Sequence, residues 1–78
     1  MTTIQPTRAE ARYLARRHLL IELFLVRVLG LEPAEAPAEA DALAHVVSER
    51  LLARIDALMG WPDRDLRGER IPRQDGWS

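Results

Sequence analysis

The sequence comprises 78 residues, enough for one small domain, and it contains no cysteine. These facts exclude disulfide bridges, thiolate metal sites and cysteine nucleophiles. Twelve acidic residues stand against eleven basic ones, a net charge of −1, so the composition favours neither a nucleic-acid binder nor a polyanion mimic.

The charges are nevertheless unevenly distributed along the chain. Residues 1–30 hold five arginines against two acids, whereas residues 31–60 hold six acids against two arginines, and residues 61–78 balance. Arg12, Arg16 and Arg17 before an apolar run resemble a signal peptide, but Glu22 and Arg27 interrupt that run. The apolar run is also too short to span a bilayer as a helix, so we expect no membrane segment and a cytoplasmic location.

The first predicted helix covers about residues 7–29. Thr7 and Glu10 have the spacing of a capping box, in which each side chain accepts a hydrogen bond from the backbone of the other residue. The helical pattern then continues to Leu29, and Gly30 is placed to end it in the left-handed conformation.

The second predicted helix covers about residues 38–59. Pro37 can begin a helix, and acidic residues near the start suit the helix dipole. Gly60 and Pro62 end the pattern. The short connector between the helices predicts an all-α fold, an antiparallel two-helix hairpin. Its seam is formed by Leu14, His18, Ile21, Leu25 and Val28 of the first helix and Ala40, Leu43, Ala44, Val47, Leu51, Ile55 and Leu58 of the second.

The first helix carries more apolar surface than a hairpin can cover. Leu19, Leu20, Leu23 and Val26 point away from the predicted seam, and leaving them in water would cost a small domain much of its stability. A second copy that completes a four-helix bundle is the simplest cover, and a groove on a larger protein is another. A third is the C-terminal segment, folded back over this face.

Residues 61–78 form a predicted extended arm, separate from a hairpin domain of residues 1–60. The arm is polar, yet it holds Trp61 and Trp77 together with four arginines, which are residue types enriched at binding hot spots. We therefore expect Trp61 and Trp77 to anchor the arm on a partner or on the helices.

Three arginines lie close to the predicted seam, namely Arg17, Arg50 and Arg54. They either cover apolar surface with their stems while Glu10 pairs with Arg54, or they form a pocket for a carboxylate or phosphate. Arg8, Arg12 and Arg16 form a basic stripe on the outer face, which is either solvated or faces an acidic partner.

No constellation predicts catalysis or a cofactor. His18 and Glu22, like His45 and Glu49, lie one turn apart, but His45 and Glu49 point away from the predicted seam, so we expect no metal site. The serines have no identifiable base, and the isolated glycines form no phosphate-binding loop.

The sequence thus predicts a non-enzymatic interaction module. We expect an accessory subunit, an assembly factor, a phage structural component or an inhibitor of a larger complex. It would dock through the back of the first helix and the Trp/Arg arm, on itself or on a larger protein, and not on nucleic acid. The alternative is a small dimeric enzyme or sensor that binds an anionic metabolite through Arg17, Arg50 and Arg54.

Overall fold

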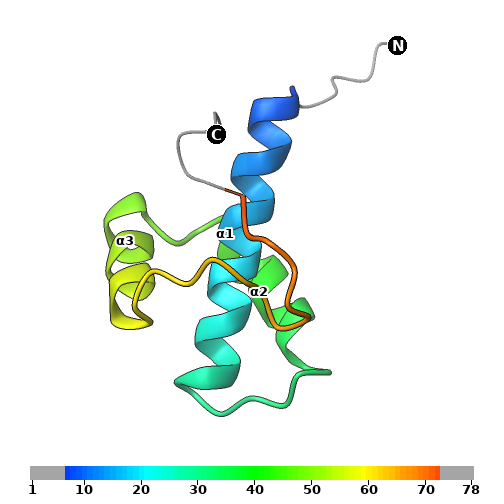
Figure 1. The fold of residues 1–78 in the computed structure, drawn as a ribbon, viewed down its shortest axis with the longest axis vertical. Coiled ribbons are helices and arrows are strands. Elements are labelled where there is room, and N and C mark those ends of the chain that lie inside the picture. The colour runs from blue at the N-terminus through cyan, green and yellow to red at the C-terminus, as the bar shows by residue number, and fades with distance from the viewer. Residues whose placement is uncertain (1–6, 73–78) are drawn as a thin grey trace.

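The computed structural model describes residues 7–72, which form three helices: α1 (Arg8–Arg27), α2 (Ala36–Ala44) and α3 (Glu49–Leu58). The long α1 runs through the middle of the molecule, and both α2 and α3 pack against it (Figure 1). Within residues 7–72 the strand-like pairing is limited to one isolated bridge between Arg64 and Arg70. The all-α prediction is confirmed.

The start of α1 follows the sequence closely. The Thr7 hydroxyl accepts a hydrogen bond from the Glu10 amide at 3.1 Å, and the Glu10 carboxylate accepts one from the Thr7 amide at 2.9 Å. The predicted capping box is therefore present. The hydrogen bond from the Thr7 backbone also lowers the pKa of the Glu10 carboxyl. At the other end, Gly30 has φ +78°, as the predicted helix stop requires.

The prediction of one continuous helix over residues 38–59 is wrong. The chain leaves the helix after Ala44, and Ser48 takes an extended conformation as the N-cap of α3. Its hydroxyl accepts a hydrogen bond from the Leu51 amide at 3.1 Å. A serine at this position offers the backbone an alternative to a helical hydrogen bond, and this alternative prevails here. The molecule is consequently not a two-helix hairpin.

The break explains how the apolar surface of α1 is covered. Two short helices reach more of the circumference of α1 than one long helix would. Leu20 and Leu23, which we expected on an open back face, are completely buried, while Leu14 and Val28 of the expected seam remain partly exposed. Leu19 and Val26 are half-buried against the same core.

Small side chains set the contact between α1 and α2. Ala36, Ala40 and Ala44 lie one turn apart along α2, and all three are buried. Because alanine projects little beyond the backbone, α2 can approach the large apolar side chains of α1 closely.

The segment after α3 turns sharply at Gly60. Gly60 has φ +76°, its amide bonds to the Ala57 carbonyl at 3.0 Å, and the Trp61 amide bonds to the Asp56 carbonyl at 2.9 Å. This pair of bonds is a Schellman motif, which ends α3. Trp61 also has a positive φ of 53°, which is unusual for a bulky residue.

The same segment then folds back onto the core. Asp65 is buried, and its Oδ1 accepts hydrogen bonds from the amides of Arg67 at 2.8 Å and Glu69 at 2.9 Å. The turn that Asp65 organises brings Ile71 into the core, with Leu66 packed against it. Part of the predicted arm therefore covers the helices, through Leu66 and Ile71 rather than through Trp61, which is 71% exposed. Trp77 lies outside the described residues, and the division at residue 60 stays a prediction.

Within residues 7–72, no helix combines the length and the apolar character that crossing a bilayer needs.

Candidate functional site

Three consecutive residues of α1 bind three different parts of the molecule. Successive helical residues point about 100° apart, so Arg16, Arg17 and His18 face different directions. Arg16 pairs with α3, Arg17 binds the end of α2 and the turn that follows it, and His18 lies against α2. The polar residues in the middle of α1 therefore hold the other helices in place.

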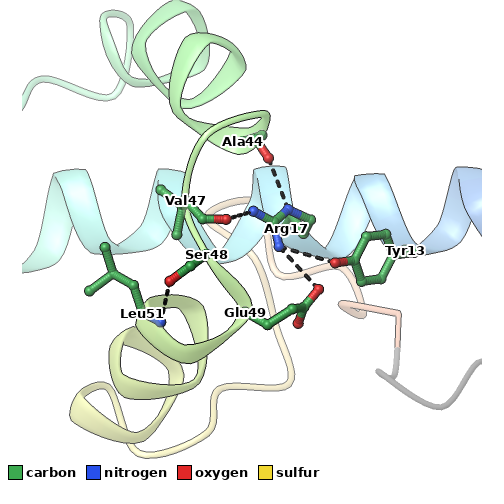
Figure 2. Close-up of polar contacts among 7 residues, drawn as sticks. All are labelled: Tyr13, Arg17, Ala44, Val47, Ser48, Glu49 and Leu51. Atoms are coloured by element: carbon green, nitrogen blue, oxygen red, sulfur yellow. Dashed lines mark hydrogen bonds and ion pairs between the residues drawn. The ribbon is translucent and has the colours of Figure 1, made fainter.

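Arg17 is the centre of a polar network that joins α1, the end of α2 and the start of α3 (Figure 2). Its Nε donates to the Ala44 carbonyl at 2.9 Å, and its Nη2 donates to the Val47 carbonyl. Nη1 donates to the Tyr13 hydroxyl at 3.1 Å and reaches the Glu49 carboxylate at 3.3 Å. Carbonyls at the end of a helix lack intrahelical donors, so a guanidinium is a suitable partner for them. The side chain is 6% exposed.

Arg16 forms a second, separate ion pair. Its Nη2 lies 2.7 Å from Asp56 Oδ2, and both side chains are nearly buried, with 11% and 12% exposed. The pair lies beside a cavity of about 150 Å³ that Trp61 also lines. A charge-assisted bond this short and this sheltered ties α1 to α3.

His18 lies between two carboxylates. Its Nε2 is 3.4 Å from Glu22 Oε2, one turn further along α1, and its Nδ1 is 3.8 Å from Asp41 Oδ1 on α2. The Glu22 side chain is only 4% exposed, whereas that of Asp41 is 80% exposed. His18 of α1 thus lies next to one carboxylate of its own helix and one of α2.

The three arginines of the predicted anion pocket do not meet. Arg17 is occupied by carbonyls and by Glu49, while Arg50 and Arg54 are exposed on α3. Arg17 faces Glu49 rather than Arg50, because the break before α3 shifts the register that a continuous helix would have had. The predicted partner of Arg54, Glu10, instead caps α1.

The predicted docking residues are also separated. Leu20 and Leu23 are core residues of the chain and are not available to a partner, which corrects our expectation. Leu19 and Val26 are half-buried. Trp61 is exposed just after α3, where it lines the cavity beside Arg16 and Asp56, and Leu51 and Leu58 are exposed on α3.

This geometry defines the class of protein as a small three-helix domain. Buried arginines stabilise the domain, and imidazole and carboxylate groups lie between α1 and α2. Residues 7–73 match the family model described as "Iron dependent repressor, metal binding and dimerisation domain". The chain belongs to this family.

Solved structures of similar proteins agree with this assignment. A manganese-dependent transcriptional repressor in complex with manganese is 47% identical, with a TM-score of 0.85, over 97% of this chain and 36% of that chain. Another manganese-dependent transcriptional repressor is 52% identical, with a TM-score of 0.78, over 85% of this chain and 36% of that one.

A curated relative points the same way. An uncharacterised HTH-type transcriptional regulator of Methanocaldococcus jannaschii is 38% identical over 50 residues, which is 64% of this chain and 40% of the relative. The chain therefore spans well under half the length of the relatives it matches.

The family corrects our functional prediction. The chain belongs to a repressor-domain family, and its two solved relatives are named as manganese-dependent transcriptional repressors. The prediction of an accessory subunit, assembly factor, phage component or inhibitor is therefore wrong, and so is the alternative of an enzyme or sensor for an anionic metabolite. Self-association, which we also predicted, fits the dimerisation named in the family description.

Within residues 7–72, the side chains around His18 do not by themselves make up a complete metal centre. The two nitrogens of an imidazole project from different edges of the ring. Because Glu22 lies at the Nε2 edge of His18 and Asp41 at the Nδ1 edge, the three side chains do not converge on one point. Within residues 7–72 no group of three or more histidines and carboxylates is arranged to hold a metal ion.

Sequence reasoning missed several of these residues, although some left a signal. Ser48 followed by Glu49 is a typical helix start, and it could have revealed the break before α3. The pairing of Arg16 with Asp56 depends on that break, so no hairpin register could have predicted it. The turn at Asp65 has a weaker signal in the sequence, since an aspartate three residues before a glycine, here Gly68, is typical of a turn.

Proposed function

We propose that this chain is the self-associating domain of a metal-dependent transcriptional repressor. The observation that carries the proposal is the family match over residues 7–73, which includes every residue that the structure describes. The two solved repressors support it with identities of 47% and 52%. In this role the domain brings two copies of a regulator together, so that the regulator acts as a symmetric pair.

The proposed contact surface is the outer side of α3 with Trp61. Among residues 7–72, seven large apolar side chains are exposed, and four of them fall between residues 46 and 61: Val46, Leu51, Leu58 and Trp61. Leu51 and Leu58 are two turns apart, so they lie on one face of α3. Trp61 follows α3 with a positive φ and is 71% exposed, and an exposed tryptophan of this kind has the character of a binding hot spot.

A matched set of variants tests this surface. Leu58→Ser and Trp61→Ser remove apolar area from the proposed contact, and Leu29→Ser removes similar area from the end of α1, where Leu29 is 57% exposed. Sedimentation velocity should show dissociation of the first two variants at concentrations where the wild type and Leu29→Ser remain associated. Dissociation of Leu29→Ser alone would place the contact at the end of α1 instead.

The response to metal and the binding of DNA are proposals for the whole regulator. The solved relatives are named as manganese-dependent repressors, and this chain spans about a third of their length. We assign no DNA contact to residues 7–72. A transcriptional regulator works where the DNA is, so a cytoplasmic location remains our proposal.

A further inference from the structure

The cavity beside the Arg16–Asp56 ion pair is bounded by α1, by α3 and by the turn that follows α3. Its volume is about 150 Å³, and its lining combines apolar and charged side chains: Arg16, Glu49, Leu52, Ala53, Asp56 and Trp61. An engineered apolar cavity of about 150 Å³ in another protein binds benzene, so a space of this size suits an aromatic ring.

Trp61 forms one wall of the cavity in an unusual backbone conformation. Its φ is +53°, directly after Gly60 with a φ of +76°, and the residue is 71% exposed. A positive φ is costly for a bulky residue, and residues held in this way cluster at binding sites. Leaving a large apolar ring in water is costly as well. Both costs are offset if another group packs against the cavity side of the ring.

The chemistry of the lining favours an indole as that group. An indole can pack against Trp61 and contact Leu52, because aromatic pairs attract each other in offset and edge-on arrangements. A guanidinium such as that of Arg16 is attracted to the face of an indole more strongly than to other aromatic rings. The indole N–H requires an acceptor, and the Glu49 carboxylate lines the same cavity with a side chain that is 55% exposed.

The chain itself carries a second tryptophan within reach of the cavity. Trp77 follows Ile71 by six residues and lies outside the described range. The Ile71 amide donates to the Asp63 carbonyl at 2.9 Å, and Asp63 is two residues after Trp61. The path from Ile71 through Asp63 to Trp61 is therefore about 12 Å, whereas six residues of extended chain span about 20 Å.

We propose that Trp77 docks in this cavity of its own chain, against Trp61. The docked ring connects the C-terminal segment to both α1 and α3 and shields the Arg16–Asp56 pair from water. Because an indole has two faces, Trp61 keeps one face at the surface proposed for self-association. The docking does not depend on the proposed function, since a single copy of the chain holds both the ring and the cavity.

NMR of the full 78-residue chain tests the docking directly. Nuclear Overhauser contacts are expected between the ring protons of Trp77 and the methyl groups of Leu52 and Ala53. A mixture of isotope-labelled and unlabelled chains separates contacts within a chain from contacts between copies, and we expect the contacts of Trp77 to fall within one chain. The absence of contacts to Leu52 and Ala53, or contacts that arise only between copies, would overturn the proposal.

Thermal unfolding provides a second test. Trp77→Ser should lower the unfolding midpoint by about 4–8 °C, the shift that a typical single-site loss gives in a chain of this length. Trp77→Phe keeps an aromatic ring and should retain more of the midpoint. Gln74→Ser, in the same segment, is the matched control and should leave the midpoint unchanged.

A double-mutant cycle connects the two tryptophans. Trp61→Ser removes the wall against which Trp77 packs, so Trp77→Ser should have little further effect on the midpoint in that background. An equal loss from Trp77→Ser with and without Trp61 would overturn the proposal, as would a Trp77→Ser midpoint equal to that of the wild type.

Discussion

The Nε of Arg17 donates a 2.9 Å hydrogen bond to the carbonyl oxygen of Ala44, the last residue of α2. This bond connects the middle of the longest helix to the point where the predicted second helix stops. The same guanidinium also donates to the Val47 carbonyl, so two carbonyls that the break leaves without helical partners are satisfied. The break and the arginine thus belong to one structural arrangement.

Replacing Arg17 by Met should destabilise the domain by about 2–4 kcal/mol, because two sheltered carbonyls lose their donors. Chemical denaturation monitored by circular dichroism measures the change. Arg54→Met, on the exposed face of α3, is the matched control and should change the free energy of unfolding by less than about 0.5 kcal/mol. Equal changes in the free energy of unfolding at the two positions would show that Arg17 contributes no more to stability than an exposed arginine.

Replacing one partner of the Arg16–Asp56 ion pair should lower the free energy of unfolding more than replacing both partners with apolar side chains. Asp56→Ala leaves a guanidinium nearly buried without its carboxylate, and we expect a loss of about 3–5 kcal/mol. The double variant Arg16→Met with Asp56→Leu should recover much of this loss, because neither remaining side chain is charged. If the losses of stability in the single variants Arg16→Met and Asp56→Leu simply added up in the double variant, this account of the pair would be contradicted.

Asp65 should contribute to the acid sensitivity of the fold. Hydrogen bonds from the backbone, that of Glu69 foremost, hold the pKa of its carboxyl below the ordinary value of 3.8. The folded chain therefore binds this proton less readily than the unfolded chain, and the contribution to stability is lost as the pH falls below 3.8 through the lowered pKa.

The matched variant for this prediction is Asp65→Asn, whose side-chain oxygen can still accept from both amides without titrating. Unfolding midpoints measured from neutral pH down to pH values below 3.8 should fall less steeply for this variant than for the wild type. Asp65→Ala should be less stable than both at neutral pH. Parallel pH profiles for the wild type and Asp65→Asn would show that other carboxyls govern the acid limb.

The alanine face of α2 should tolerate no enlargement. Ala40→Leu forces a larger side chain into a position with no exposed surface, and overpacking of this kind costs about 1–3 kcal/mol. Ala42→Leu, at an exposed position of the same helix, is the control and should be close to neutral. Thermal melts of the two variants give the comparison directly.

The sequence was informative where a feature depends on neighbouring residues. The Thr7–Glu10 box and the stop at Gly30 are local, and both are present. The all-α class followed from periodicity that extends over many residues. By contrast, the register between the helices depends on the break in the backbone helix before Ser48. The helical spacing of apolar residues in the sequence continues through this break. Periodicity alone does not record such a break.

The functional prediction failed for a related reason. The apolar circumference of α1 suggested an incomplete molecule, but Leu20 and Leu23 are covered within the chain by the two short helices and Ile71. The residues that remain exposed, Leu58 and Trp61 among them, lie elsewhere. His18 and Glu22 stood in the sequence as a plausible pair, yet only the packing of α2 brings Asp41 to the same ring. No spacing rule connects Asp41 to His18.

The mass of the chain in solution tests the central claim most directly. The chain is 8.9 kDa, and sedimentation equilibrium over a range of micromolar concentrations should give about twice that mass for the wild type, in EDTA as in MnCl2. A mass of 8.9 kDa at every concentration, in both buffers, would contradict a domain that serves to pair two copies of a repressor.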